Sequence, residues 1–458
     1  MTPRRADPLT DALLQETVLS EWFEPMANAF EKVRFSDAIF QSLPMTSFCL
    51  LGGVRQLLAI DTLREQIQML FHWQENAEQV PVPRSTWSDA MSSPTRRNIL
   101  RQAMSYLVTT ARAVLPNKYA GLEGIGERPI QAIDATYQEE SSHYARVLPV
   151  EGGNDNQKGH MLLTYYDLRQ GIPLNVRTET ASMGEMRVLK HQDDNERDWS
   201  RCRNAIYVVD RAFIDATYWD ERKDALKATV ITRMKSGLVY TIGEKRKVSE
   251  SVANENVLVD HIIQLNCSKQ PWRLIQWLSP DGIVYEYLTN DFSLEPGVVA
   301  FLYYRRWDEE KYFDSFKNDL ANAKAWGKSP IAIEQQALMG MMTYLLTQLF
   351  LQRRYQELNL TTGDTTQAAK QDRKVEQYLR QKEERMDTEH EGVGDEDRNE
   401  DKNEEVVELR YYDAYRAFYA HLSKITRQVW RFLKNCFHRK SSLALYQRQL
   451  RPLLIKYL

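Results

Sequence analysis

The chain has 458 residues, of which 43% are hydrophobic and 27% are charged, and its formal net charge is −3. This length exceeds one ordinary hydrophobic core, so two or three domains are expected. The near-neutral balance excludes a uniformly basic nucleic-acid-binding protein. The four cysteines show no paired spacing, which argues against a disulfide framework and against a zinc site.

No segment predicts insertion into a membrane. The two arginines near the N-terminus are not followed by an apolar run, so no signal peptide is expected. The most apolar window, 337–351, is shorter than the roughly 20 residues that span a bilayer, and we expect a buried helix there. Unpaired cysteines suit a reducing compartment, so the sequence predicts a cytoplasmic protein.

Residues 1 to 120 predict a helical domain. Apolar residues recur at helical spacing in three stretches, 9–33, 54–72 and 98–114. Before the third stretch, Ser93 is a candidate helix cap and Pro94 suits a first helical position. Arginines crowd this turn: Arg84, Arg96, Arg97 and Arg101. The turn predicts either a DNA-contacting helix-turn-helix, with Arg96 and Arg97 facing phosphates, or an ordinary helical hairpin with exposed arginines.

From residue 129 the pattern changes to short β-type runs. Apolar strands are expected to end in Asp134 and in Asp210, with a hairpin and a polar helix between them at 160–166, 174–178 and 184–198. This order predicts a mixed sheet with helices packed against it. Residues 225–292 then form short alternating runs separated by turn residues, which indicates a β-rich insertion.

The stretch 301–320 predicts one amphipathic helix with an unusual face. Tyr303, Trp307, Glu310 and Lys317 recur at spacings that place them on one side of a helix. An apolar stripe would normally occupy such a face. The ordinary alternative is a solvated face with intrahelical ion pairs, such as Arg306 with Glu310.

The C-terminal part divides by charge. Residues 383–408 are strongly acidic and contain no aromatic residue, so they cannot bury a core and predict a flexible linker. Residues 409–458 are basic and rich in aromatic residues, which is typical of a helical tail that binds nucleic acid or a partner subunit. A helix that caps the core with a basic outer face is an equal alternative.

Three acids of the chain suit one metal site. If the strands ending in Asp134 and Asp210 are neighbours, their carboxylates converge at one edge of the sheet, and Glu310 on an adjacent helix supplies a third. Carboxylate oxygens are preferred ligands of Mg²⁺ and Mn²⁺. Two such ions about 4 Å apart hold the attacking and leaving oxygens of a phosphoryl displacement. Each acid alone is weak evidence, because acids at strand ends are common turn residues.

The spacing of Tyr303, Arg306, Glu310 and Lys317 resembles the YREK signature of bacterial insertion-sequence DDE transposases, in their hairpin-forming branch. The acids in Ile-Asp134-Ala-Thr and in Tyr-Val-Val-Asp210-Arg-Ala-Phe are similar to the family's first two acids, in the same order. The resemblance covers about residues 80–350. It implies an RNase H-like α/β core, interrupted by the β-rich insertion and flanked by a helical N-terminal domain and a helical C-terminal tail.

The resemblance also implies roles for single residues. Asp134, Asp210 and Glu310 are expected to be catalytic and to hold two Mg²⁺ or Mn²⁺ ions. The expected DNA contacts are Tyr303, Arg306, Lys317, Arg211 and Trp307, the last by stacking on a flipped base. Glu309 is the rival for the third metal ligand, and the YREK spacing favours Glu310.

The expected domains follow from these features. They are a helical DNA-end-binding domain at 1–120, the two parts of the catalytic core at 121–224 and 296–382, the β-rich insertion at 225–295, the linker at 383–408 and the tail at 409–458.

The implied activity is cleavage of double-stranded DNA at the inverted-repeat ends of an insertion sequence. The 3′-hydroxyl ends are then joined to target DNA, which is also double-stranded. A hairpin intermediate, a homodimer acting on two ends and a nucleoid-associated location in the bacterial cytoplasm follow from the resemblance. Two alternatives stay open: a transposase-derived DNA-binding protein, and a metal-dependent DNA nuclease without strand transfer.

Overall fold

The structure, a computed structural model, describes residues 18–35, 37–40, 42–60, 62–66, 82–119, 122, 124–139, 159–181, 183–190, 202–279 and 282–357. The expected acidic linker and basic tail lie outside the described residues. Within these ranges, none of the helices combines the length and the apolarity needed to cross a membrane.

A nine-stranded mixed sheet runs through the molecule in the order β3-β2-β1-β4-β5-β9-β8-β7-β6. The first five strands in the chain are β1 (Ile130–Glu139), β2 (Gly159–Asp167), β3 (Ile172–Thr180), β4 (Ile206–Val209) and β5 (Thr229–Arg233). The remaining strands are β6 (Tyr240–Lys245), β7 (Val257–Leu265), β8 (Pro271–Leu278) and β9 (Val284–Thr289).

The strand order of the first half is RNase H-like. β1 pairs antiparallel with β2, which pairs antiparallel with β3, while β4 pairs parallel with β1 and β5 pairs parallel with β4. Most residues of the parallel strands β1, β4 and β5 are buried, as expected for strands covered on both faces, and β4 is wholly apolar. The predicted mixed α/β fold is therefore confirmed.

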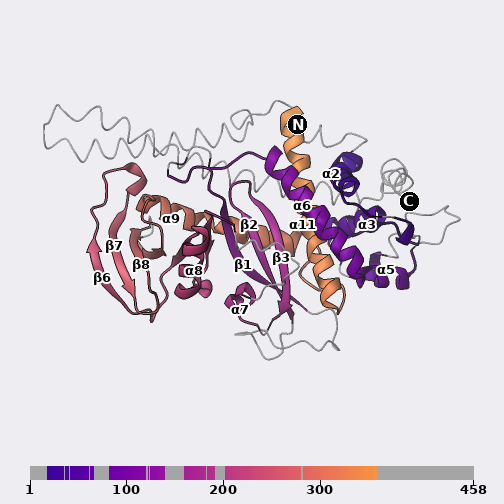
Figure 1. The fold of residues 1–458 in the computed structure, drawn as a ribbon. Helices are drawn as coiled ribbons and strands as arrows, with labels where there is room; N and C mark the ends of the chain where they lie inside the picture. Colours follow the sequence, from indigo (N-terminus) through magenta and orange to yellow (C-terminus); the bar gives the residue numbers. More distant parts are fainter. Residues whose placement is uncertain are drawn as a thin grey trace, which may run out of the picture.

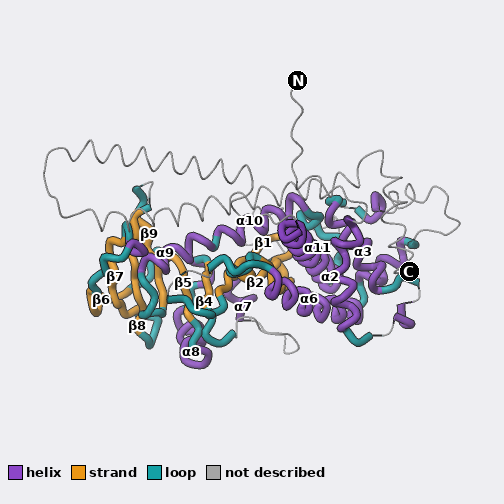
Figure 2. Tube along the Cα trace, turned by 90° about the horizontal axis from the view of Figure 1, so that it is seen from above, coloured by secondary structure: helices purple, strands orange, loops and turns teal. Residues whose placement is uncertain are grey.

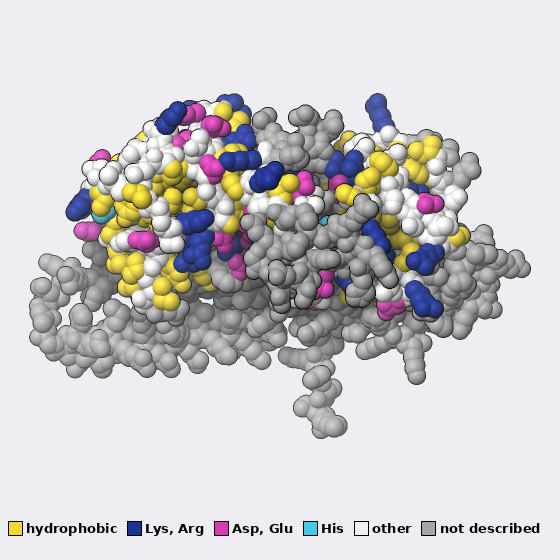
Figure 3. All heavy atoms as spheres, turned by 90° about the horizontal axis from the view of Figure 1, so that it is seen from below, with side chains coloured by type: hydrophobic (Ala, Val, Ile, Leu, Met, Phe, Trp, Pro, Cys, Tyr) yellow, Lys and Arg dark blue, Asp and Glu magenta, His cyan; other side chains and the backbone are white. Residues whose placement is uncertain are grey.

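The β-rich insertion continues this sheet. β9 pairs antiparallel with β5, β8 with β9, β7 with β8 and β6 with β7. β9 thereby covers the edge of β5, which would otherwise present unpaired backbone groups. At the far end, apolar side chains are exposed among Lys, Arg, Asp and Glu (Figure 3). The exposed apolar residues of the insertion include Val239, Ile242, Leu258 and Ile283.

Helices gather at the opposite end of the molecule (Figures 1 and 2). They are α2 (Val18–Lys32), α3 (Met45–Leu57), α5 (Arg84–Met91), α6 (Pro94–Val114) and α11 (Pro330–Glu357). α11 contacts α2, α3, α6 and β3, so it joins the helical region to the sheet. The buried residues of 337–351 belong to this helix, as the sequence predicted.

The turn between α5 and α6 follows the predicted capping chemistry. Ser93 caps α6 by accepting a hydrogen bond from the backbone N–H of Arg96, and Pro94 is the first residue of the helix. α6 then runs unbroken through 98–114. Two short helices of the chain, α7 (Glu185–Lys190) and α8 (Ala216–Leu226), pack near β2 and β5 respectively.

The prediction of one continuous helix over 301–320 was wrong, because the structure divides this stretch into separate helical segments. The structure has α9 (Pro296–Arg305), then α10 (Trp307–Asp314), then a π-helical turn over Ser315–Asp319. Arg306 stands between α9 and α10. Polar spacing along a sequence does not reveal such a break, because three- and four-residue repeats survive a local change of helical pitch.

Candidate active site

The two predicted aspartates lie beside each other at one edge of the parallel strands. In the ladder between β1 and β4, Ile133 is paired with Val209, and the next residues are Asp134 and Asp210. Asp210 therefore follows its strand directly. Asp134 does not end its strand, as expected from the sequence, because β1 continues to Glu139 in its pairing with β2. What ends at Ile133 is the pairing with β4.

The guanidinium of Arg306 joins the three predicted acids. Its Nη1 donates to Oδ2 of Asp134 at 2.9 Å, and its Nη2 donates to Oε1 of Glu310 at 2.6 Å and lies 3.8 Å from Oδ2 of Asp210. Residues from β1, the end of β4 and α10 thus meet at one point. Burial opposes the charge on Arg306, but the surrounding carboxylates outweigh it and raise its pKa.

The placement of Arg306 has a consequence for cation binding. Among the residues that the structure describes, no group of three or more His, Cys, Asp or Glu side chains is gathered closely enough to hold a metal ion. The guanidinium occupies the space between the carboxylates and compensates their charge. Burial raises the pKa of Asp134 to about 6, and Arg306 acts in the opposite direction. The donor set itself, three carboxylates with oxygen ligands, suits a divalent cation.

Glu309 lies inside the protein next to this cluster. Its side chain is fully buried, whereas the side chain of Glu310 is 32% exposed. Neither carboxylate oxygen of Glu309 makes a hydrogen bond to a side chain among the described residues. Burial, reinforced by Asp134, raises the pKa of Glu309 well above its usual range. Burial therefore favours the neutral form of the Glu309 carboxyl, and the partly exposed Glu310 is the neighbouring acid that contacts Arg306.

The predicted DNA contacts near the acids differ in exposure. Tyr303 is 6% exposed and lies under Arg306, whose guanidinium is 5.7 Å from its ring centre. Arg211 follows Asp210 and is exposed. Lys317 is partly exposed within the π-helical turn, and burial lowers its pKa. Trp307 begins α10, but its side chain lies outside the described part of the chain.

The structure contradicts the expected DNA contact at Arg96. This side chain is 5% exposed, donates to the backbone oxygen of Leu43 and lies over the rings of Phe40 and Phe48. A guanidinium in this position stabilises the helical region and cannot reach a phosphate. Arg97 is 24% exposed and lies 3.7 Å from Glu334 of α11, so it remains accessible.

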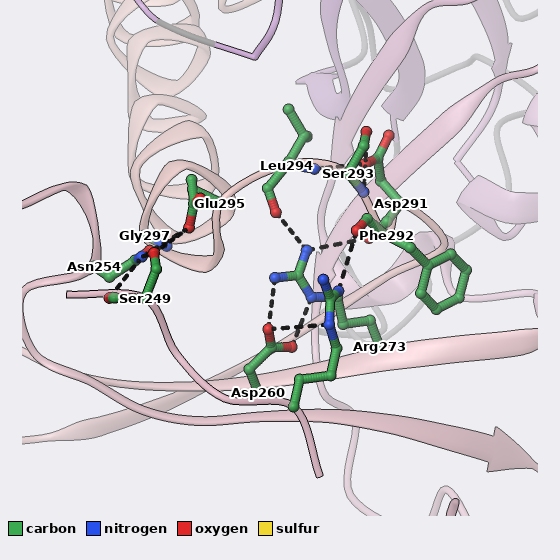
Figure 4. A network of polar contacts seen from close by, with 11 residues as sticks. Ser249, Asn254, Asp260, Arg273, Asp291, Phe292, Ser293, Leu294, Glu295 and Gly297 are labelled. Atoms are coloured by element: carbon green, nitrogen blue, oxygen red, sulfur yellow. Dashed lines mark hydrogen bonds and ion pairs between the residues drawn. The ribbon is translucent and has the colours of Figure 1, made fainter. Parts of the chain in front are cut away.

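A buried polar network, which the sequence did not indicate, anchors the start of α9 (Figure 4). Arg273 of β8 donates two 2.7 Å hydrogen bonds to Asp260 of β7 and a third to the backbone oxygen of Leu294. Both ionic side chains are at most 3% exposed. Asn254 accepts from the backbone N–H of Gly297, where a side chain would collide with the backbone of Ala253. These contacts fix α9, which leads directly to Arg306.

Comparison with known protein families finds a match over the stretch that contains these residues. Residues 125–346 match the family described as Transposase DDE domain. The matched stretch holds all nine strands of the sheet, α9, α10 and the first 17 of the 28 residues of α11. Asp134, Asp210 and Glu310 lie within this matched stretch.

Two single proteins are also similar to this chain. "Putative transposase y4zB" of Sinorhizobium fredii (strain NBRC 101917 / NGR234) is 25% identical over 151 residues, which are 32% of this chain and 42% of that relative. The chain thus spans less than half of the relative's length. A cryo-EM structure of the piggyBac transposase synaptic complex with hairpin DNA aligns with 99% of this chain and 86% of that one, at 12% identity and a TM-score of 0.37.

Proposed function

We propose that the chain is a DNA transposase of an insertion sequence. It binds the inverted-repeat ends of the element, cleaves them by two-metal phosphoryl transfer through a hairpin, and joins the 3′-hydroxyl ends to target DNA. The observation that supports this most is the meeting of Asp134, Asp210 and Glu310 at Arg306, within a transposase DDE domain.

The three carboxylates are suited to hold the metal ions. Bound Mg²⁺ or Mn²⁺ would lower the pKa of an attacking water or 3′-hydroxyl and stabilise the leaving oxygen. Asp134 and Asp210 approach from neighbouring strands, and Glu310 approaches from α10, so the three donors are held by separate rigid elements. Arg306 must leave its present hydrogen bonds when cations enter, and a DNA phosphate is a suitable new acceptor for its guanidinium.

The cationic side chains around the acids are suited to hold the DNA backbone. Arg211 is exposed directly beside Asp210, and Lys317 is one π-helical turn beyond α10. Arginine binds phosphate through two parallel hydrogen bonds, while lysine acts as a compact charge. We propose that both contact the phosphates near the cleaved bond, that Trp307 stacks on a base, and that a homodimer brings two ends together.

Substitution of the acids tests the proposed activity. Asp134→Asn, Asp210→Asn and Glu310→Gln should each abolish cleavage and joining of a duplex that carries the element's own terminal sequence, in the presence of Mg²⁺ or Mn²⁺. Each variant should still shift the same duplex in a gel, because the amide side chains keep the shape of the site. Joined products, besides nicks, distinguish a transposase from a nuclease.

The exposed Glu250 of the insertion provides the matched control. Glu250→Gln removes the same charge at a distance from the acids and should cleave like the wild type. Full cleavage by Glu310→Gln would remove this residue from the catalytic set, and full cleavage by Asp210→Asn would overturn the proposed function.

A further inference from the structure

Residues 320–326, which follow the π-helical turn, are held by α3 of the helical N-terminal region. The side-chain amide of Gln56, on α3, accepts a hydrogen bond from the backbone N–H of Ala321 at 3.0 Å. The same amide exchanges two hydrogen bonds with the amide of Asn322, at 2.9 and 3.1 Å, and donates another to the backbone oxygen of Gln336 at 3.1 Å. The two donors and two acceptor positions of the Gln56 amide are therefore all used.

Two further buried glutamines hold the same segment. Gln336 of α11 donates to the backbone oxygens of Ala321 and Lys324, and Gln138 of β1 donates to the backbone oxygen of Asn322. These amides are fully buried, so another position of the segment would leave polar groups without hydrogen bonds and away from water. We call the four side chains the amide clamp: Gln56, Gln138, Asn322 and Gln336.

The amide clamp begins where the turn that carries Lys317 ends. The backbone N–H of Leu320 donates to the oxygen of Ser315 at 3.1 Å and closes the π-helical turn. The next residue is Ala321, whose N–H is bonded by Gln56. π-helical turns are rare and frequently occur at functional sites. Here the position of the turn depends on how the chain after it is fixed.

Gly340 of α11 provides the surface on which both the turn and the clamp rest. A Cβ atom added at this residue would collide with the amide of Asn322 and would lie 2.8 Å from the ring of Phe316, within the turn. The absence of a side chain at Gly340 therefore lets the segment approach α11 closely. Gln56 holds the segment from α3, and α11 supports it at Gly340.

We propose that the amide clamp is a positioning device for Lys317, through which α3 takes part in DNA binding at the acids. This inference rests on the proposed function, in which Lys317 contacts a phosphate of the DNA end. Lysine binds phosphate as a compact charge, so its contribution depends on where the turn holds the ammonium group. α3 lies outside residues 125–346, so the stretch that matches the Transposase DDE domain lacks Gln56. The helical N-terminal region and the site thus act as one unit.

Binding of the end duplex in EDTA, measured over a range of salt concentrations, tests this inference on the full chain. Gln56→Met removes the amide at similar volume, and Gly340→Ala displaces the segment from the side of α11. Each should reduce the slope of log affinity against log salt by about 0.9, the loss expected for one phosphate contact. Gln56→Met combined with Lys317→Ala should reduce the slope no further than Lys317→Ala alone, because both changes remove the same contact.

Two matched controls separate positioning from a general loss of stability. Asn290→Leu removes another buried amide, which accepts from the backbone N–H of Val230 and donates to the backbone oxygen of Ala228. Gly52→Ala, on α3, would collide with Met339 of α11 instead of the segment. Both variants should keep the wild-type slope, and urea unfolding identifies the variants that are folded.

The outcomes distinguish this inference from the proposed function. An unchanged slope in folded Gln56→Met and Gly340→Ala, beside a reduced slope in Lys317→Ala, would overturn the inference and leave the proposed function standing. A reduced slope in either control, or a slope in the double variant below that of Lys317→Ala, would overturn it as well. Asp210→Asn should lose cleavage and keep the wild-type slope, so it tests the proposed function separately.

Discussion

At the scale of residues, Arg306 compensates the charge of the three candidate acids, Asp134, Asp210 and Glu310. Clustered carboxylates repel one another, and a guanidinium among them lowers that cost. Arg306 lowers this cost because its guanidinium donates hydrogen bonds to Asp134 and to Glu310 at the same time. The sequence placed Arg306 four residues before Glu310, a spacing that also fits an ordinary pair on one helix. Only the position of Asp134, far away in the chain, distinguishes the two readings.

Substitution of Glu309 and of Glu310 by glutamine should affect DNA cleavage differently. Glu310→Gln is expected to lose cleavage, as stated above. Glu309→Gln should keep cleavage, because burial favours the neutral form of the Glu309 carboxyl and an amide can replace a neutral carboxyl.

The same substitution should change how stability depends on pH. The folded pKa of Glu309 is raised, so the wild type loses stability as pH rises above the unfolded value of about 4.3 and towards the folded pKa. Glu309→Gln should therefore become more stable relative to the wild type as pH rises from about 4 to 8, measured by urea unfolding. A Glu309→Gln variant that is folded but fails to cleave would make Glu309 the third acid.

At the scale of elements, the insertion holds the helix that leads to the site. α9 begins where Arg273 bonds the backbone of Leu294, and it ends at Arg305, one residue before Arg306. The buried pair of Arg273 and Asp260 therefore connects β7 and β8 to the acids. Sequence patterns marked these strands as an insertion but did not indicate the pair, because its two members are identified only by the pairing of the strands.

Removal of one member of this pair should be costly. Arg273→Met leaves Asp260 buried without its partner and should lower the free energy of unfolding by about 3–5 kcal/mol. Arg273→Met with Asp260→Leu should recover much of this loss, since no buried charge remains. Urea unfolding of the full chain measures both.

The partly exposed pair of Arg97 and Glu334 is the matched control. Arg97→Met should cost less than about 1 kcal/mol. A loss at Arg273 as small as that at Arg97 would show that the buried pair does not hold α9.

At the scale of the whole molecule, charge distribution matters more than its sum. The net charge of −3 does not favour DNA, but Arg211, Arg233 and Lys317 stand at or near the edge that carries the acids. β5 and β9 extend the half of the sheet that carries the acids into the insertion without a gap. Binding to DNA is therefore expected to follow this edge.

The salt dependence of duplex binding tests that expectation. Lys317→Ala should weaken binding of the end duplex and reduce the slope of log affinity against log salt by about 0.9, the value for one lost phosphate contact. Lys32→Ala removes an exposed lysine of α2 and should leave the slope unchanged. A slope that is equal in both variants would place Lys317 away from the DNA.

The sequence alone determined the strands as they follow along the chain, the capping of α6 and the buried helix α11, and it singled out Asp134, Asp210 and Glu310 as candidate acids, because periodicity, turn chemistry and spacing are local properties. It could not determine the break at Arg306, the burial of Arg96 and Glu309, or the pair of Arg273 and Asp260. These depend on contacts between residues far apart in the chain. The register of β1 against β4, and the extension of the sheet from β5 to β9, were decided only by the tertiary structure.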